Sequence, residues 1–191
     1  MTSEEQTWPW FLLLRDINPE MVMAWLDIFD DYGPWSTGSN NILHQRGDAI
    51  ISPANSYGYM DGGIDLAYRT HFGLGLQNRL QHYLEEKFGG MLPVGQAIII
   101  PTMKEGIPHM IVAPTMDRPR DVSKTQNAYV AMKAALAAVA EYNQRAAESG
   151  TPAIYRILCP GMCTGIGMMN PFVSARQMRQ AVDEVLESWN Q

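Results

Sequence analysis

The sequence has few of the residues that would support a disulfide framework or a metal site. Only two of its 191 residues are cysteines, Cys159 and Cys163. This excludes a disulfide-based fold and favours a reducing, cytoplasmic compartment. The four histidines are scattered and form no pair at metal-ligand spacing, so we expect neither a structural metal nor a cofactor. They are His44, His71, His82 and His109.

The sequence also lacks a basic cluster and a long apolar run. Its formal net charge is −6, with no local concentration of Lys and Arg, which argues against a nucleic-acid partner. No apolar stretch approaches the length of a membrane span, and residues 1–6 are too polar for a signal peptide. The acidic balance still permits a small anionic ligand, because backbone amides at helix N-termini can hold phosphate.

The chain does contain an alternation of short apolar runs and helical patterns, with an ordinary globular composition of 46% hydrophobic and 18% charged residues. This alternation predicts an α/β layered fold in a single domain over residues 1–191. Strands are predicted at residues 11–14, 49–51, 97–100, 110–113 and 154–159. Helices are predicted from Pro19 to about Gly33, from about Gly63, at 76–88, at 123–148 and from Pro171. Residues 33–47, rich in Gly, Ser and Asn, are predicted to form a loop.

Three polar or glycine-rich stretches follow predicted strands: residues 15–17, 52–65 and 160–169. Open α/β sheets bind ligands at the carboxyl ends of their strands. The sequence therefore predicts that these three stretches form one site, although this argument does not name the ligand.

The stretch after the second predicted strand contains Asn55, Gly62, Gly63 and Asp65. An asparagine amide offers donors and an acceptor to a sugar hydroxyl, and the two glycines allow a ligand to approach the backbone. A purely structural interpretation is also open. In that interpretation Asn55 closes a turn, and Asp65 complements the dipole of a short helix.

The stretch after the last predicted strand contains Gly161, Gly165 and Gly167 within seven residues. Such a loop between a strand and a helix can present a row of amides to a diphosphate. It is neither a P-loop nor a complete G-x-G-x-x-G motif. Cys163 in this loop is either a reactive thiol or, as we favour, a small residue that fits.

Together these stretches resemble the macro-domain family. Residues 48–55 and 61–65 are similar to its signature Asp-Ala-Ile-Val-Asn-Ala-Ala-Asn followed by Gly-Gly-Gly-Val-Asp. Residues 161–167 are similar to its second loop, Gly-Ile-Ser-Thr-Gly-Ile-Phe-Gly. The resemblance implies a three-layer α/β/α fold with a central mixed sheet. It also implies an N-terminal extension at residues 1–9 and an inserted loop at 33–47.

The resemblance further implies an ADP-ribose site. Asp16 would accept from the adenine amino group, and Ile17 would lie against the adenine ring. Asn55 and the segment Gly62, Gly63 and Ile64 would hold the distal ribose. The loop would wrap the diphosphate with Gly161, Cys163, Thr164, Gly165, Ile166 and Gly167. The implied partners are ADP-ribose or an ADP-ribosylated protein, with no membrane partner.

The resemblance leaves catalysis open. In the MacroD-like hydrolytic branch, the aspartate matching Asp65 activates a water, and Asn55 with Asp65 would be the catalytic residues here. That branch has glycine where this chain has Leu66, histidine where it has Arg69, and an aromatic residue in the second loop where it has none. Three hypotheses remain: a hydrolase of ADP-ribosyl esters, a module that binds ADP-ribose without turnover, and a structural protein that has lost the site.

Overall fold

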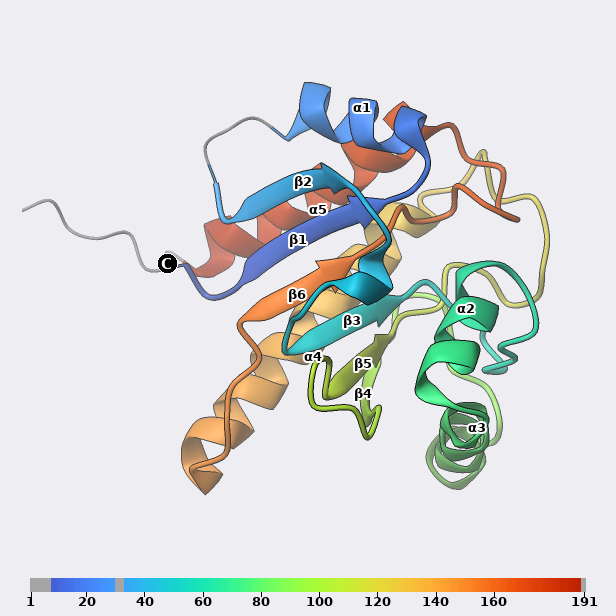
Figure 1. Cartoon of the computed structure of the whole chain (residues 1–191), viewed down its shortest axis with the longest axis vertical. Coiled ribbons are helices and arrows are strands. Elements are labelled where there is room, and N and C mark those ends of the chain that lie inside the picture. Colours follow the sequence, from blue (N-terminus) through green and yellow to red (C-terminus); the bar gives the residue numbers. More distant parts are fainter. Residues whose placement is uncertain (1–7, 30–32, 190–191) are drawn as a thin grey trace, which may run out of the picture.

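A computed structural model describes residues 8–29 and 33–189 of the chain (Figure 1). The strands are β1 (Phe11–Asp16), β2 (Trp35–Ser39), β3 (Ala49–Ser52), β4 (Ile98–Pro101), β5 (His109–Val112) and β6 (Arg156–Cys159). The helices are α1 (Pro19–Ile28), α2 (Gly63–Phe72), α3 (Gly75–Phe88), α4 (Asn127–Ser149) and α5 (Pro171–Trp189), with a 3₁₀ turn, η1, at Ile42–His44.

The six strands form one sheet in the order β2-β1-β6-β3-β5-β4. Every neighbouring pair is parallel except β4 and β5, which are antiparallel. Parallel strands covered by helices on both faces need apolar side chains throughout, which is why they read as unbroken apolar runs. This confirms the predicted three-layer α/β/α architecture with a mixed sheet.

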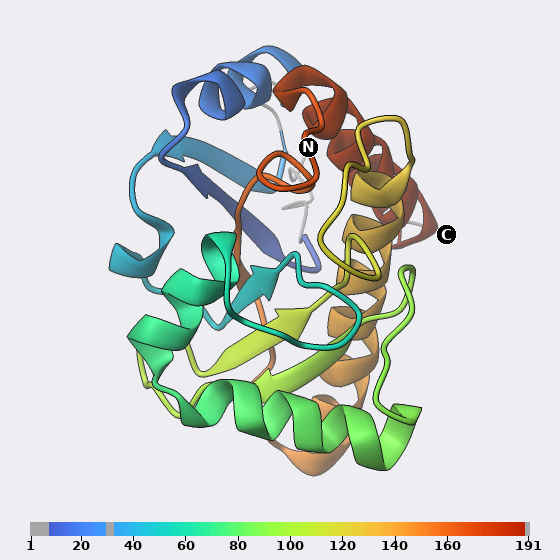
Figure 2. The same ribbon diagram turned by 90° about the vertical axis from the view of Figure 1, so that its right-hand side faces the viewer.

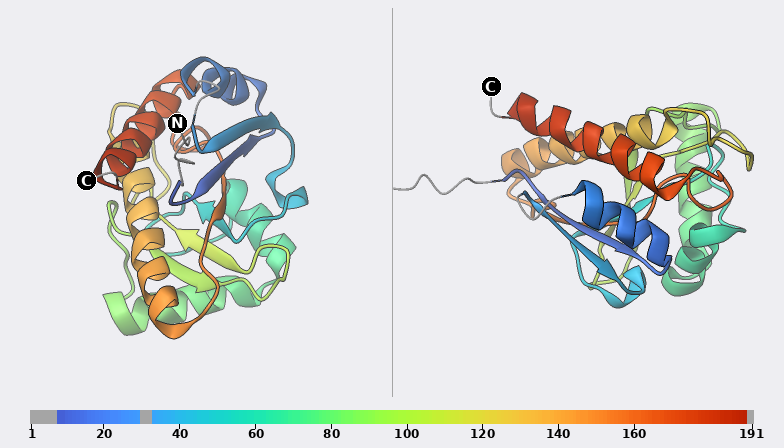
Figure 3. Two further views of the ribbon diagram at one scale, coloured as in Figure 1. Left: turned by 90° about the vertical axis from the view of Figure 1, so that its left-hand side faces the viewer. Right: turned by 90° about the horizontal axis from the view of Figure 1, so that it is seen from above.

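Alternate residues of each strand enter two separate cores. In β1, Leu12 and Leu14 pack in a core with residues of α1, α4 and α5. Leu13 points to the opposite face, where the core includes residues of α2 and α3. Figure 3 shows α4 and α5 side by side along their face of the sheet. The period-two alternation of the strand therefore fills both helical layers from one sheet.

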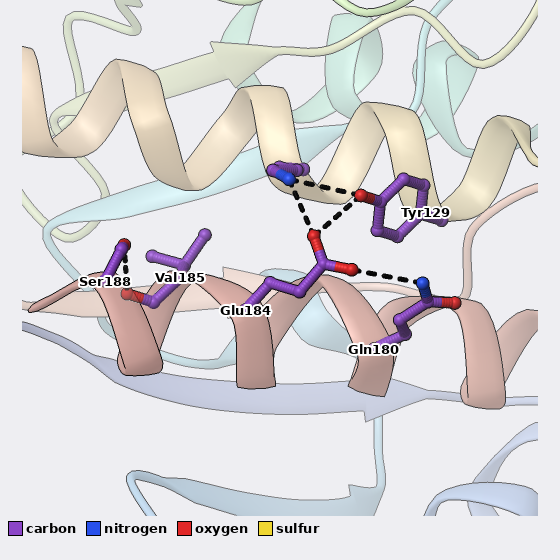
Figure 4. Close-up of polar contacts among 6 residues, drawn as sticks. Tyr129, Gln180, Glu184, Val185 and Ser188 are labelled. Atoms are coloured by element: carbon purple, nitrogen blue, oxygen red, sulfur yellow. Dashed lines mark hydrogen bonds and ion pairs between the residues drawn. The ribbon is translucent and has the colours of Figure 1, made fainter.

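A polar contact joins α4 to α5 in the space between the two helices (Figure 4). Glu184 of α5 accepts hydrogen bonds from Lys133 Nζ at 2.6 Å and from the Tyr129 hydroxyl at 2.7 Å. Gln180 donates to the other Glu184 oxygen at 3.1 Å. These bonds lower the pKa of the Glu184 carboxyl to about 2, and the bond from Lys133 has the largest effect.

The loop predicted over residues 33–47 is wrong in part, because Trp35–Ser39 form strand β2 at the edge of the sheet. Its short Trp-Ser-Thr-Gly-Ser sequence mixes strand-favouring Trp and Thr with Gly and Ser and has no apolar run, so tertiary contacts decide its structure. The Arg15 guanidinium donates to the Ser36 carbonyl at 2.7 Å and to the Ser36 hydroxyl at 3.0 Å. The Trp35 ring is buried and packs edge-on against Phe29 at 5.4 Å between ring centroids.

The predicted end of the first helix near Gly33 is also wrong, because α1 ends at Ile28. Its start is as predicted, with Asn18 as the N-cap and Pro19 as the first helical residue. Phe29 turns to an extended conformation while its amide still donates to the Trp25 carbonyl. The burial of its ring against Trp35 explains why the chain leaves the helix there.

Among residues 8–29 and 33–189, no helix has both the length and the apolar character that crossing a bilayer requires. Residues 1–7 of the predicted N-terminal extension at 1–9 lie outside the described residues.

Candidate functional site

A cleft opens at the edge of the sheet where the parallel strands end. Figures 1 and 2 show the segments that follow β1, β3 and β6 converging at this edge beside α2. The cleft has a volume of about 440 Å³, within the range of about 300–1,000 Å³ that is typical of small-molecule sites. It is lined by residues from all three predicted stretches: Asp16, Ile17, Asn55, Gly62, Gly63, Ile64, Asp65, Gly161, Cys163, Thr164, Gly165, Ile166 and Gly167.

Asp16, at the end of β1, joins two walls of the cleft. One carboxylate oxygen accepts from the Asn18 amide at 2.9 Å, and the other accepts from the Gly161 amide at 3.0 Å. A Cβ at Gly161 would lie 2.9 Å from that second oxygen and equally close to the Met21 side chain, so a larger residue would force these side chains to move. Each carboxylate oxygen has a further lone pair for a donor in the cleft. Asp16 can therefore bind a ligand while it holds the loop after β6.

Ile17, next to Asp16, lines the cleft with 77% of its surface exposed. An exposed apolar side chain beside a carboxylate is suited to a flat heteroaromatic ring that also carries a hydrogen-bond donor.

The loop after β6 presents unused backbone amides to the cleft. Its own closing bonds come from Met168, which donates to the Gly165 carbonyl at 3.0 Å, and from Met169, which donates to the Cys163 carbonyl at 2.9 Å. The amides of residues 164–167 donate to no group in the described part of the chain. Such a row of free amides is a typical anion-binding arrangement.

Two residues of this loop have structural reasons for their identity. A Cβ at Gly167 would lie 2.6 Å from the Cys163 carbonyl oxygen, so no larger residue fits there. Cys163 itself is buried, and burial raises the pKa of its thiol to about 12. The thiol is therefore protonated at neutral pH, which supports the interpretation of Cys163 as a small residue that fits.

The N-terminus of α2 forms the opposite wall. Its cap residue, Gly62, provides no side-chain hydrogen bond to the first turn, so the amides at this end lack an internal partner. Gly63 has a φ of 55°, in the left-handed region that favours glycine. This end of α2 can therefore bind a hydroxyl or an anionic oxygen of a ligand.

Asn55 lies on the cleft wall with its side chain already bonded. Its amide nitrogen donates to the Tyr59 carbonyl at 2.7 Å, and its oxygen accepts from the Tyr57 amide at 3.1 Å. The side chain thus closes the turn after β3, as the structural interpretation predicts. One amide hydrogen remains for a ligand hydroxyl, so a ribose contact by Asn55 stays a prediction.

Asp65 combines burial with a place on the cleft wall. The residue is 7% exposed, and its Oδ1 accepts from the Ser52 hydroxyl at 2.5 Å. Burial raises the pKa of this carboxyl to about 6, Asp61 adds to the rise, and the Ser52 hydrogen bond opposes it. A carboxyl with a pKa near neutrality is suited to general acid or base chemistry.

The arginine that replaces the histidine of the hydrolytic branch does not line the cleft. Arg69 lies one turn after Asp65, and its guanidinium donates to Gln77 of α3 at 3.3 Å. Leu66, in place of the branch's glycine, is 39% exposed and also lies outside the cleft. Neither substitution blocks the cleft, and neither side chain assists Asp65 by a direct contact in the described structure.

Several residues of the cleft were not predicted from the sequence. The segment after β2 contributes Asn41, Ile42 and Leu43 beside the end of β1. The sequence predicted a loop over residues 33–47 and no strand there. The rule based on strand ends therefore could not locate residues 41–43. Thr115 and Met116 enter from the segment after β5. Since they follow the strand predicted at residues 110–113, the rule that located the other stretches would have located these two as well.

The chain belongs to the macro domain family, whose family model matches residues 51–178. An uncharacterized protein of Aquifex aeolicus (strain VF5) is 30% identical over 143 residues, which are 74% of this chain and 76% of the relative.

Solved macrodomain structures share the fold. The macrodomain of Mycobacterium tuberculosis DarG superimposes with a TM-score of 0.63 at 19% identity, covering 78% of this chain and 90% of the other. A point mutant of the Oceanobacillus iheyensis macrodomain with ADPR gives 0.62 at 18% identity, covering 77% and 75%. Thermosipho africanus DarTG in complex with ADP-ribose gives 0.56 at 12% identity, covering 76% and 37%.

Proposed function

We propose that the cleft binds ADP-ribose or an ADP-ribosyl group. The observation that carries the proposal is the cleft itself, in which an exposed apolar side chain, a loop of free amides and an uncapped helix N-terminus face one space. The structures of two relatives with ADPR or ADP-ribose support the same ligand class.

The chemistry of the cleft walls determines the orientation of the bound ligand in this proposal. The adenine lies at Ile17 with its amino group donating to Asp16, and the diphosphate lies against the amides of residues 164–167. The distal ribose then lies between Asn55 and the start of α2, close to Asp65. In this orientation the two negative phosphates meet amides rather than the Asp65 carboxylate.

Calorimetric titration tests the binding proposal. We expect ADP-ribose to bind with micromolar affinity or better and AMP to bind more weakly, because AMP lacks the distal ribose and one phosphate. Equal affinities for the two ligands would contradict the distal-ribose assignment, and no binding of ADP-ribose would contradict the proposed function as a whole.

A second candidate function is hydrolysis of ADP-ribosyl esters, such as a mono-ADP-ribosylated carboxylate of a protein or O-acetyl-ADP-ribose. The observation that favours it is the buried Asp65 carboxyl, which lines the cleft and has a pKa of about 6. Once ionised, it can accept a proton from a water that attacks the ester or the anomeric carbon of the distal ribose. The rate is then expected to fall as the pH drops below about 6, because the base becomes protonated.

Release of ADP-ribose from a modified protein, followed by mass spectrometry, tests this second function. Asp65→Ala is expected to lower the rate by about a hundredfold or more, with a much smaller effect on ADP-ribose affinity. Asp61→Ala is the matched control, since Asp61 is an exposed carboxylate on the same cleft. Because Asp61 raises the pKa of Asp65, the comparison is made at pH 8, where Asp65 is ionised with or without Asp61. If the wild type binds ADP-ribose without turnover, the non-catalytic module is favoured. Full activity in Asp65→Ala would mean that another group activates the attacking water.

A further inference from the structure

The contact between Ser52 and Asp65 connects the sheet to α2 underneath the cleft. Ser52 is the last residue of β3, is 1% exposed, and donates through its hydroxyl to Asp65 Oδ1 at 2.5 Å. The family signature has asparagine where this chain has serine, so this contact belongs to the chain's own sequence.

Ser52 is the only side chain among the described residues that donates to the Asp65 carboxylate. No Lys, Arg or His in that part of the chain forms an ion pair with it. The ionisable groups that interact with it are Asp61 before α2 and the buried Tyr68 one turn later, and Arg69 on the same helix is turned toward α3. Asp16 and the buried, neutral thiol of Cys159 interact with Tyr68. The Tyr68 hydroxyl donates to the Ile51 carbonyl at 3.1 Å and is not directed to Asp65.

The two oxygens of Asp65 have different surroundings. Oδ1 is bonded to Ser52, whereas Oδ2 accepts no hydrogen bond from the described residues and is not fully buried. Because Asp65 lines the cleft, Oδ2 is the oxygen available to a ligand or a water. A hydroxyl that fixes one oxygen thereby selects the orientation of the other.

We propose that Ser52 is a positioning residue: its hydroxyl fixes the Asp65 carboxylate so that Oδ2 faces the distal-ribose end of the cleft, and it favours the charged form of that carboxylate. The Ser52 contact thus lowers the pH at which the Asp65 carboxyl becomes charged, against the opposite effect of burial. The identity of the ligand rests on the proposed function, but the effect on Asp65 does not.

Carbon-13 NMR of the side-chain carboxyl carbons, assigned with Asp65→Asn, tests the effect on Asp65 without any ligand. We expect Asp65 to titrate near pH 6 in the wild type. In Ser52→Ala we expect its midpoint to rise by about one pH unit, since one hydrogen bond to a charged group is lost. Ser52→Thr retains the hydroxyl and is expected to keep the wild-type midpoint. Ser56→Ala, which truncates another buried serine that bonds elsewhere, is the matched control.

An unchanged Asp65 midpoint in Ser52→Ala would overturn the proposal, and so would the same rise in Ser56→Ala. If the extra methyl of Ser52→Thr prevents folding, as thermal melting would show, Ser52→Cys replaces it. A thiol is a weak donor, so Ser52→Cys is expected to behave like Ser52→Ala, and a wild-type midpoint in Ser52→Cys would contradict the role of the hydroxyl.

Titrations with ADP-ribose between pH 5 and pH 8 separate this inference from the proposed function. We expect the affinity of the wild type to change around the Asp65 midpoint and the change to move with that midpoint in Ser52→Ala. If ADP-ribose binds at one affinity across this range in both proteins, Oδ2 does not face the ligand and the inference fails. If ADP-ribose does not bind at all, the proposed function fails, and the NMR midpoints alone decide the role of Ser52.

Discussion

Substitution of Gly165 by valine separates ligand binding from folding. A Cβ at Gly165 would meet no atom within 4 Å, and the backbone there is not in the left-handed region. The fold therefore has room for a valine. Gly165 lines the cleft among the free amides of residues 164–167. In the proposed binding mode, the two added methyl groups occupy the space of the diphosphate.

The expected loss follows from the contacts that the valine prevents. A hydrogen bond to a charged group contributes about 1.5–3 kcal/mol. If the side chain displaces the diphosphate from two of the four amides, binding weakens by about 3–6 kcal/mol, or roughly a hundredfold to ten-thousandfold. Calorimetry with ADP-ribose measures this loss, and thermal melting checks that the fold is retained.

Two other glycines provide matched controls for Gly165→Val. Gly106 lies in the turn between β4 and β5, outside the cleft, and a Cβ there also meets nothing within 4 Å. Gly106→Val is expected to preserve both binding and melting temperature. At Gly167, where a Cβ would lie 2.6 Å from the Cys163 carbonyl oxygen, valine is expected to lower the melting temperature instead. A stable Gly165→Val protein that binds ADP-ribose as tightly as the wild type would refute the diphosphate assignment.

Three further predictions follow from individual carboxylates. Asp16→Ala is expected to weaken ADP-ribose binding by about 1–3 kcal/mol and to reduce the preference for adenine over guanine. Competition between ADP-ribose and guanosine diphosphate-ribose measures this preference. An unchanged preference would mean that another residue recognises the base. Burial raises the pKa of Asp65 from 3.8 to about 6, so its charge destabilises the folded state by about 3 kcal/mol above pH 6 and not below pH 3. Asp65→Asn is therefore expected to raise the free energy of unfolding in urea at pH 8 but not at pH 3, and equal effects at both would contradict the linkage. Contacts with Lys133 and Tyr129 lower the pKa of Glu184 to about 2, so their stabilising effect is present at pH 7 and lost as the pH falls through 2. Glu184→Gln is expected to lower the melting temperature slightly at pH 7 and to leave it unchanged at pH 2, and an equal loss at both would attribute the effect to packing.

The sequence allowed the site to be predicted wherever a strand end marked it. The apolar runs before Asp16, Ser52 and Pro160 predicted strands of an α/β sheet, and such sheets bind ligands at the carboxyl ends of their strands. The convergence of three distant segments on one cleft followed from that rule and from the resemblance to the macro-domain family. The structure confirms that convergence.

The parts that could not be predicted depend on contacts between distant residues. Strand β2 forms because Arg15 bonds to Ser36 and because Trp35 packs on Phe29. Neither contact leaves a local pattern in the sequence. The wall at residues 41–43 depends on β2, and the bond between Ser52 and Asp65 spans 13 residues. Propensity and periodicity describe neighbours along a chain, and these features are set by neighbours in space.

The carboxylate of Asp16 connects two segments of the cleft wall, because one oxygen accepts from the Asn18 amide and the other from the Gly161 amide. A ligand that bonds to Asp16 is connected through this carboxylate to the Gly161 amide and the loop that begins there. We therefore expect occupancy of one half of the cleft to lower the entropic cost of occupying the other half. By reciprocity, a nucleoside and a diphosphate-sugar fragment are expected to increase each other's affinity by the same factor. If this holds, the whole ligand binds more tightly than its separate parts would indicate, which titration of each fragment alone and in the presence of the other measures.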